Sequence, residues 1–91
     1  MSTGTVVHLL NGVTASGAGD AHRPIGSNRT FQVSGISGDT VKIQVSNDNS
    51  NWVDLITTTA DGGWTDDAPW RYVRANVTVY SAGTITVTVG V

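Results

Sequence analysis

The sequence predicts a small all-β domain, an antiparallel β-sandwich of about six or seven strands. Three observations lead to this prediction. Apolar and polar residues alternate with period two along most of the chain, and Val, Ile and Thr fill many of these positions. Segments rich in Gly, Asn, Asp and Ser interrupt the alternation at short intervals. No stretch shows the i, i+3, i+4, i+7 spacing of an amphipathic helix.

The alternating segments give the expected strands in chain order. The first, TVVHLL, is the least regular. After it come TFQVS, TVKIQVS, NWVDLITT, WRYVRANVTVY and TITVTVGV, at residues 30–34, 40–46, 51–58, 70–80 and 84–91. The last two are expected to form a terminal hairpin, because only a short turn, YSAG, separates them.

The same alternation assigns side chains to the two faces of each strand. The inward face of the last strand is predicted to carry Ile85, Val87, Val89 and Val91. The inward face of the strand before it is predicted to carry Val73, Ala75, Val77 and Val79, opposite Tyr72, Arg74, Asn76, Thr78 and Tyr80. In NWVDLITT, the pattern predicts Val53 and Leu55 on one face, opposite Trp52, Asp54 and Ile56.

Residues 11–29 are the exception to the alternation. They are rich in Gly, Ala and Ser and have no regular pattern, and loops of this length in a small domain are usually functional or mobile. We therefore expect a single domain over residues 1–91, in which residues 1–29 form a partly extended arm or loop. Contact with a neighbouring subunit and simple flexibility are both open for this segment.

Composition limits the size of the core and the class of partner. A chain of 91 residues without cysteine has a thin core and no disulfide, so we expect self-association to add stability. A net charge of −2 with 13% charged residues does not favour a nucleic-acid binder. No apolar run could span a bilayer, and the first residues do not resemble a signal peptide, so synthesis in the cytoplasm without processing is expected.

The polar residues do not combine into a recognisable reaction centre. His8 and His22 are the only histidines, and Asp20 beside His22 is a weak metal motif. The acidic and amide clusters at 46–51 and 61–67 are better explained as turns than as calcium loops, and an exposed acidic edge is expected for the second. No nucleophile elbow or phosphate-binding loop is present. We therefore expect a protein that is not an enzyme, with no catalytic residue, no metal and no cofactor.

The aromatic residues are the best candidates for a contact surface. Trp and Arg are enriched where interfaces hold most of their binding energy, and we expect an interface that includes Trp52, Trp64, Trp70, Arg71, His22 and Arg23. The tryptophans could instead cover the ends of a thin core. Sugar binding is a third possibility, and it would need at least two of them to line an open groove. Arg71 and Arg74 are expected to bond to Asp66, Asp67 or Asp54.

Two segments resemble a group of small tailed-phage virion proteins. VSNDNSNWVDL (45–55) and APWRYVRANVTVYSAGTITVTV (68–89) are similar to that group's strand, S-N-D-G-x-N-W turn and late R-Y-V-R-A-N-V strand. The segments LLNGVTASGAG and FQVSG are similar as well, in the same order. Asn49 stands where the group commonly has Gly, and Asn tolerates the same backbone conformation. The N-W turn and R-Y-V-R strand also resemble galactose-binding sandwiches, whose domains are much longer.

The resemblance implies a jelly-roll or galactose-binding-like sandwich with a structural role in a virion. The most specific expectation is a capsid decoration or cement protein, a homotrimer that binds the major capsid protein or another virion protein. The alternatives are a tail or fibre component, or a carbohydrate-binding module. The chain would be made in the cytoplasm of the host bacterium and would reside in the virion, without nucleic-acid or membrane contact.

Overall fold

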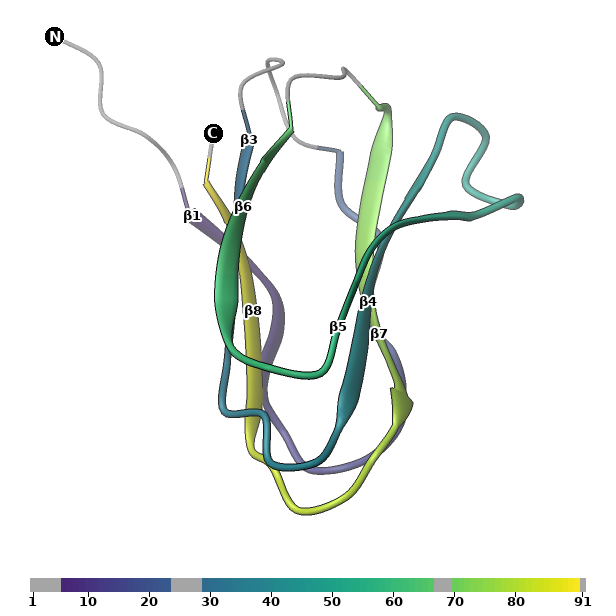
Figure 1. Cartoon of the computed structure of the whole chain (residues 1–91). Coiled ribbons are helices and arrows are strands. Elements are labelled where there is room, and N and C mark those ends of the chain that lie inside the picture. The colour runs from purple at the N-terminus through teal and green to yellow at the C-terminus, as the bar shows by residue number, and fades with distance from the viewer. Residues whose placement is uncertain (1–5, 24–28, 67–69, 91) are drawn as a thin grey trace, which may run out of the picture.

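A computed structural model describes residues 6–23, 29–66 and 70–90 of the chain. Eight strands lie in these ranges, and no helix does. In order they are β1 (Val6–Val13), β2 (Gly17–Ala18), β3 (Arg29–Ser34), β4 (Thr40–Ser46), β5 (Val53–Thr58), β6 (Gly62–Asp66), β7 (Tyr72–Val79) and β8 (Ile85–Gly90). The strands form two layers that run roughly along the long direction of the molecule (Figure 1).

Each layer is an antiparallel sheet of four strands. Sheet I has the order β1-β8-β3-β6, and sheet II has the order β2-β7-β4-β5. In sheet I, β1 pairs with β8 and β3 pairs with β6. In sheet II, β2 pairs with β7 and β4 pairs with β5. The chain therefore folds back on itself as a long ribbon whose strands are divided between the sheets.

The prediction of a terminal hairpin was wrong. β7 pairs with β2 and β4 in sheet II, whereas β8 pairs with β1 and β3 in sheet I. The connection at residues 80–84 therefore crosses from one sheet to the other instead of turning within one. It is held by the Tyr80 hydroxyl, which donates to the Gly83 carbonyl at 2.8 Å, and by the carboxylate of Asp39.

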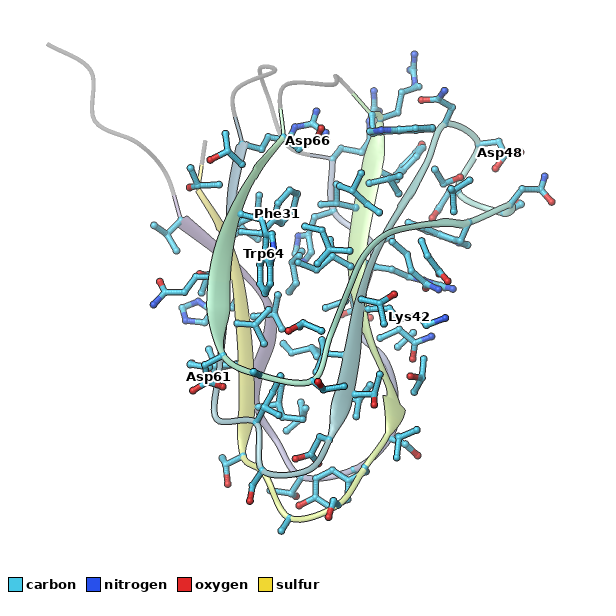
Figure 2. All side chains as sticks on the ribbon, viewed as in Figure 1. Phe31, Lys42, Asp48, Asp61, Trp64 and Asp66 are labelled. Carbon is cyan, nitrogen blue, oxygen red and sulfur yellow. The ribbon has the colours of Figure 1, made fainter. Side chains whose placement is uncertain are left out.

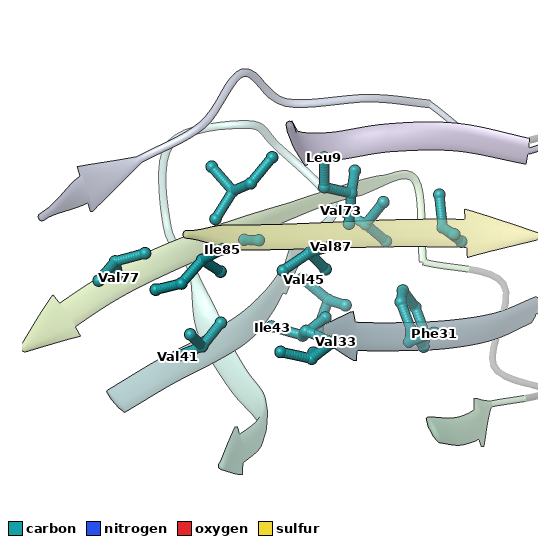
Figure 3. Packing of buried hydrophobic residues seen from close by; sticks show 13 residues of the cluster. Leu9, Phe31, Val33, Val41, Ile43, Val45, Val73, Val77, Ile85 and Val87 are labelled. Carbon is teal, nitrogen blue, oxygen red and sulfur yellow. The ribbon is translucent and has the colours of Figure 1, made fainter. Parts of the chain in front are cut away.

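The core lies between the sheets, as the alternation predicted. Thirteen buried apolar side chains from β1, β3, β4, β7 and β8 form one cluster (Figure 3). They are Leu9, Leu10, Phe31, Val33, Val41, Ile43, Val45, Val73, Ala75, Val77, Ile85, Val87 and Val89. Most are β-branched, which suits close packing on a pleated surface. Both sheets thus share a single core.

Register shifts explain where the alternation failed. One lies between His8 and Leu10 in β1, so that Leu9 and Leu10 are both buried, consistent with the irregular pattern of that segment. A second lies in β5, where Asp54 pairs with Gln44 and the next pair is Ile56 with Ile43. The prediction that Ile56 shares a face with Asp54 was therefore wrong, because the extra residue reverses the alternation.

A third shift changes the end of β7. Thr40 pairs with Val79, and the next pair is Val41 with Val77. Val79 was predicted to face inward but is 53% exposed, whereas Tyr80 packs against the core. The inward positions before the shift are confirmed, since Val73, Ala75 and Val77 are all buried.

The count of six or seven strands was also too low, because two short strands were missed. β6, with the sequence GGWTD, was interpreted as part of an acidic turn. β2 consists of only two residues, Gly and Ala. Gly and Asp are poor strand formers by propensity, and here pairing with β3 and β7 overrides that preference.

The described part of the expected arm lies on the chain's own sheets. β1 pairs with β8, β2 pairs with β7, and the backbones of His22 and Val73 exchange two hydrogen bonds of 2.9 Å. The Gly19 N–H donates to the Ala75 carbonyl at 2.8 Å. Residues 1–5 and 24–28 of the expected arm lie outside the described residues.

A buried carboxylate ties the loop before β4 to the loop before β8. Asp39 has no exposed surface, and it accepts hydrogen bonds from the backbone N–H groups of Ser37, Ser81 and Gly83 at 2.8, 2.6 and 3.0 Å. These N–H groups, Ser81 first, stabilise the ionised form and lower the pKa of Asp39 below its usual value. The folded state therefore favours the carboxylate over the acid.

We expect Asp39 to contribute to loss of stability in acid. Because its pKa is lower in the folded state, its contribution is complete above the unfolded-state value of about 4 and is lost as the pH falls towards the lowered one. Asp39→Asn should lower the melting temperature at pH 7 by roughly 5–10 °C. The variant should also lose less stability than the wild type between pH 5 and pH 2. Thermal unfolding followed by circular dichroism across that range measures both effects, and parallel pH curves for the two proteins would contradict the assignment.

Candidate interaction surface

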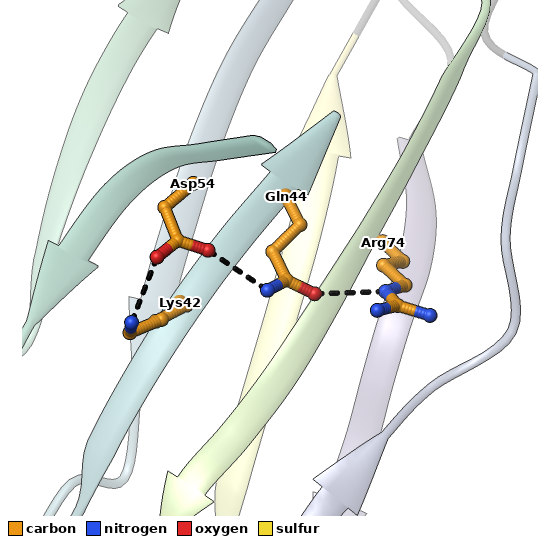
Figure 4. Close-up of polar contacts among 4 residues, drawn as sticks. All are labelled: Lys42, Gln44, Asp54 and Arg74. Atoms are coloured by element: carbon orange, nitrogen blue, oxygen red, sulfur yellow. Dashed lines mark hydrogen bonds and ion pairs between the residues drawn. The ribbon is translucent and has the colours of Figure 1, made fainter. Parts of the chain in front are cut away.

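The outer face of sheet II carries a connected row of polar side chains. Lys42 Nζ donates to Asp54 Oδ2 at 2.7 Å, and Gln44 Nε2 donates to Asp54 Oδ1 at 2.8 Å. Arg74 Nε in turn donates to Gln44 Oε1 at 2.8 Å (Figure 4). The row ends at Trp52, whose ring lies 4.3 Å from the guanidinium carbon of Arg74. We call the stacked pair Arg74 and Trp52 the platform.

Strand register places these residues side by side. Gln44 on β4 lies opposite Arg74 on β7 and opposite Asp54 on β5. Its neighbours Ile43 and Val45 are fully buried, so Gln44 points away from the core. Gln44 is nonetheless only 9% exposed, because its own hydrogen-bond partners cover it. The side-chain amide of Gln44 thus fixes the position of Arg74 Nε, and with it the orientation of the platform.

Each carboxylate oxygen of Asp54 accepts a hydrogen bond from a neighbouring side chain. Hydrogen bonds from Lys42 and then Gln44 lower its pKa below the usual value. Arg74 was expected to bond to Asp66, Asp67 or Asp54. Its Nε donates to Gln44 instead of Asp54, and Asp67 lies outside the described residues. Gln44 stands between Arg74 and Asp54 and relays the contact. The guanidinium charge of Arg74 is therefore not neutralised by this row.

A second cation lies over an aromatic ring beside the platform. The guanidinium carbon of Arg23 is 5.6 Å from the centre of the Tyr72 ring. Tyr72 is the first residue of β7. The backbone pairing of His22 with Val73 holds the preceding residue against β7. His22 thus serves as a backbone anchor, and Arg23 and Tyr72 extend the aromatic and cationic surface along β7.

The loop between β4 and β5 is held together by its own side chains. Asp48 accepts hydrogen bonds from Ser46 Oγ, from the N–H groups of Ser50 and Asn51, and from Asn51 Nδ2, at 2.7–2.9 Å. The Asn51 N–H is the first of the contacts that lower the pKa of Asp48. Asn49 has a φ of 60°, a conformation that Asn tolerates. The turn interpretation of this cluster is confirmed.

The residues predicted to form an interface divide into two groups. Trp64 on β6 lies opposite Phe31 on β3 (Figure 2). Both Trp64 and Trp70 pack against the core cluster. The other group comprises Trp52, Arg71, His22 and Arg23. Arg71 is exposed just before β7, and its N–H donates to Asn47 Oδ1 at 3.4 Å. Sequence reasoning missed Gln44 and Tyr72 as members of this surface, although the outward alternation of β4 and β7 places both there.

The outer face of sheet I has a different chemistry. The exposed or half-buried side chains on its strands include Val6 and His8 on β1, Thr30, Gln32 and Ser34 on β3, Thr65 on β6, and Thr86 and Thr88 on β8. Among the described residues, no Asp, Glu, Lys or Arg occupies an outward position on these four strands. A shallow hollow of about 700 Å³ follows β3, and Gly63 and Gly90 line it together with Thr30 and Gln32. None of the tryptophans lines this hollow.

The two described acidic residues of the 61–67 cluster lie at opposite ends of β6. Asp61 precedes β6 and accepts a hydrogen bond from the Ile36 N–H at 2.9 Å, whereas Asp66 ends the strand. Asp67 lies outside the described residues. Within the described ranges, no group of three His, Asp or Glu residues could hold a metal ion, and no helix could cross a membrane. Asp20 and His22 lie beside β7, on the other sheet from β6.

No protein-family model matches the chain, and no curated protein matches it. A solved structure does resemble it. The crystal structure of the SPBc2 prophage-derived protein YomS superposes with a TM-score of 0.77. The match covers 97% of this chain and 91% of YomS, at 16% sequence identity. The two proteins share a fold.

The likeness to YomS covers the whole architecture and not a part of it. With 97% and 91% of the two chains matched, both sheets belong to the common fold. At 16% identity the likeness concerns the fold alone, so it assigns no role to the platform or to the hollow. Those features have to be interpreted from their own chemistry.

Proposed function

We propose that the chain is a non-enzymatic structural protein of a tailed-phage virion, a capsid decoration protein that binds and stabilises the major capsid lattice. The observation that carries the proposal is the outer face of sheet I, where four strands present no formal charge among the described residues. Asp61, which lines the hollow beside β6, is a carboxylate next to this face, and covering the strands themselves desolvates no charged group. The fold shared with prophage-derived YomS and the resemblance to virion proteins support the phage assignment.

The strand order supports a specific fold for this role. We interpret the orders β1-β8-β3-β6 and β2-β7-β4-β5 as an eight-stranded jelly-roll sandwich, a ribbon folded over onto two sheets. Jelly rolls occur in viral capsid and lectin domains, and fold alone does not choose between these functions. The tryptophans favour assembly, because Trp64 and Trp70 pack against the core and not along an open groove.

The outer face of sheet I is proposed to bind a second copy of the chain. In solution the protein is a homotrimer with a mass of about 28.5 kDa, three times the 9.5 kDa of one chain. Gln32→Lys places a charge at the centre of this face, between Thr88 and Gly63, and should shift the mass towards 9.5 kDa. Size exclusion with light scattering measures the shift.

The matched control is Thr78→Lys, which adds the same charge at an exposed position on sheet II. The control should leave the mass of the assembly unchanged. Equal masses for Gln32→Lys and the wild type would show that sheet I is not the contact between copies. A wild-type monomer would contradict self-association in solution.

The virion assignment is tested directly on particles. Virions of the phage that encodes the chain are purified by density gradient and analysed by quantitative mass spectrometry. A decoration protein should be present in copies comparable to those of the major capsid protein, and a tail or fibre component in far fewer copies. Absence of the chain from purified virions would overturn the proposal, including its expected location in the virion after synthesis in the cytoplasm of the host bacterium.

A further inference from the structure

The cationic side chains of this small acidic protein gather on one side of it. The chain has five Lys and Arg residues and a net charge of −2. Arg29 is buried on β3 of sheet I. The other four are Lys42 on β4, Arg74 on β7, and Arg23 and Arg71 beside the start of β7. The outer face of sheet II is therefore positive relative to the rest of the molecule.

Three of these four cations have no carboxylate partner in the part of the chain that the structure describes. Lys42 is paired with Asp54. Arg74 contacts Gln44 and Trp52, and Arg23 contacts Tyr72. The nearby carboxylate of Asp48 is occupied by hydrogen bonds within its own loop. The carboxylates of Asp54 and Asp48 are thus bonded within the chain, while the guanidinium groups keep their charge.

Stacking prepares these guanidinium groups for planar acceptors. A ring against its face leaves the edge of a guanidinium free to donate, and two parallel N–H donors match the two oxygens of a carboxylate. The bond from Arg74 Nε to Gln44 and the ring of Trp52 fix one such group before any partner arrives. Such preorganisation lowers the entropy lost on binding.

The shape of this face selects a protein over a small ligand or a nucleic acid. The hollow of about 700 Å³ lies on sheet I, so the platform does not line it. Small ligands are usually held in concave pockets, whereas Trp, Tyr and Arg on an open face are typical of protein interfaces. Nucleic-acid binding requires more cations than three on a chain of net charge −2.

We propose that the outer face of β7 docks an acidic protein surface, with Arg74 on Trp52 and Arg23 on Tyr72 binding its carboxylates. This inference rests on the proposed function, since it names the surface that faces a partner virion protein. Sheet I then contacts further copies of the chain, and sheet II contacts the partner. The two faces differ in charge because their partners differ.

The test uses virions from a phage in which the gene for this chain is deleted. Purified full-length protein is added, and the bound amount is measured after pelleting as a function of concentration. Arg74→Gln should bind about tenfold more weakly or worse, and Arg74→Lys should recover little, because a lysine keeps the charge without the planar donors. Lys42→Gln is the matched control. It removes one charge from the same face and should change binding by less than about threefold.

Equal binding by Arg74→Gln and the wild type would overturn the inference and leave the proposed function intact. Equal losses of virion binding for Arg74→Gln and Lys42→Gln would mean that only the net charge of the face matters, and this result would overturn the inference too. Unchanged melting temperatures of the variants serve as the folding control. Failure of the wild type itself to bind virions would count against the proposed function.

A titration without virions then tests the inference independently of the proposed function. A capped peptide of alternating glutamate and aspartate and a polyphosphate of equal charge are each added to the isotopically labelled chain. Saturable shifts of the Trp52 indole N–H and the Arg74 Nε–H signals with the peptide, lost in Arg74→Gln, would support docking of an acidic protein. A response to polyphosphate alone, or no response to either probe, would overturn it.

Discussion

Replacing Gly35 by alanine is expected to remove a large share of the stability of the protein. Gly35 has a φ of +86°, and a Cβ atom placed there would overlap the carbonyl oxygen of Thr84. The two backbones are held at this approach because the Thr84 N–H donates to the Gly35 carbonyl at 3.1 Å. Backbone cannot move aside as a flexible side chain can, so the loop must separate from the start of β8.

The expected loss is about 4 kcal/mol or more in the free energy of unfolding. A domain of this size has about 5–14 kcal/mol in total, so the variant should be largely unfolded in mild denaturant. Urea unfolding followed by tryptophan fluorescence measures the change in midpoint.

The control for Gly35→Ala is Gly63→Ala on β6. A Cβ at Gly63 would make only an ordinary contact, at 3.5 Å from the Phe31 carbonyl oxygen, and the backbone there needs no positive φ. This variant should be neutral, or more stable by up to about 1 kcal/mol, because alanine costs less entropy than glycine in a strand. If Gly35→Ala unfolded at the same urea concentration as Gly63→Ala, the close approach of the two loops would be refuted.

Strand positions and most of the core could be predicted from the sequence because they depend on local alternation. Ile85, Val87 and Val89 face inward as the two-residue period required. The turn at Asn49 was predictable for a similar reason, since the side chains that build it lie within a few residues of one another. Such patterns predict structure that depends on residues close together in the sequence.

Pairing between distant segments was not encoded in any local pattern. The YSAG segment looks like a hairpin turn, but the strands on either side belong to different sheets. The register shift at Leu55 arises where β5 meets β4, and it reversed the predicted face of Ile56. The platform depends on the same information, because only strand order brings Gln44 between Asp54 and Arg74. Strand order is a property of the whole chain.

The pairing of Arg29 with Asp66 is an expected source of stability that local pattern also did not reveal. Arg29 is 2% exposed and faces the same way as Phe31, and it lies opposite Asp66 in the register of β3 and β6. Burial lowers the pKa of Arg29, and the negative charge of Asp66 opposes that shift. The carboxylate therefore helps to keep a buried guanidinium charged.

Removing one charge of this pair is expected to be costly. Asp66→Asn keeps the size of the side chain but leaves the charge of Arg29 buried without compensation, so we expect a loss of about 3 kcal/mol. Arg29→Met should lose a similar amount of stability, because it removes the positive charge that compensates Asp66. The control is Asp54→Asn, whose carboxylate is 44% exposed in its pair with Lys42, and this variant should lose much less stability because solvent screens the pair.

The double variant Arg29→Met with Asp66→Leu separates the pair from its two members. If the charges compensate one another, replacing both by apolar groups should cost less than the two single losses together, by about 1.5 kcal/mol or more. Urea unfolding of the wild type, Arg29→Met, Asp66→Leu and the double variant measures this coupling energy. Additive losses would mean that the two residues act independently, and a loss for Asp66→Asn no larger than that for Asp54→Asn would mean that Arg29 is compensated by other groups. A coupled result would place a buried ion pair at the end of the core next to Trp64, where the apolar cluster gives way to charge.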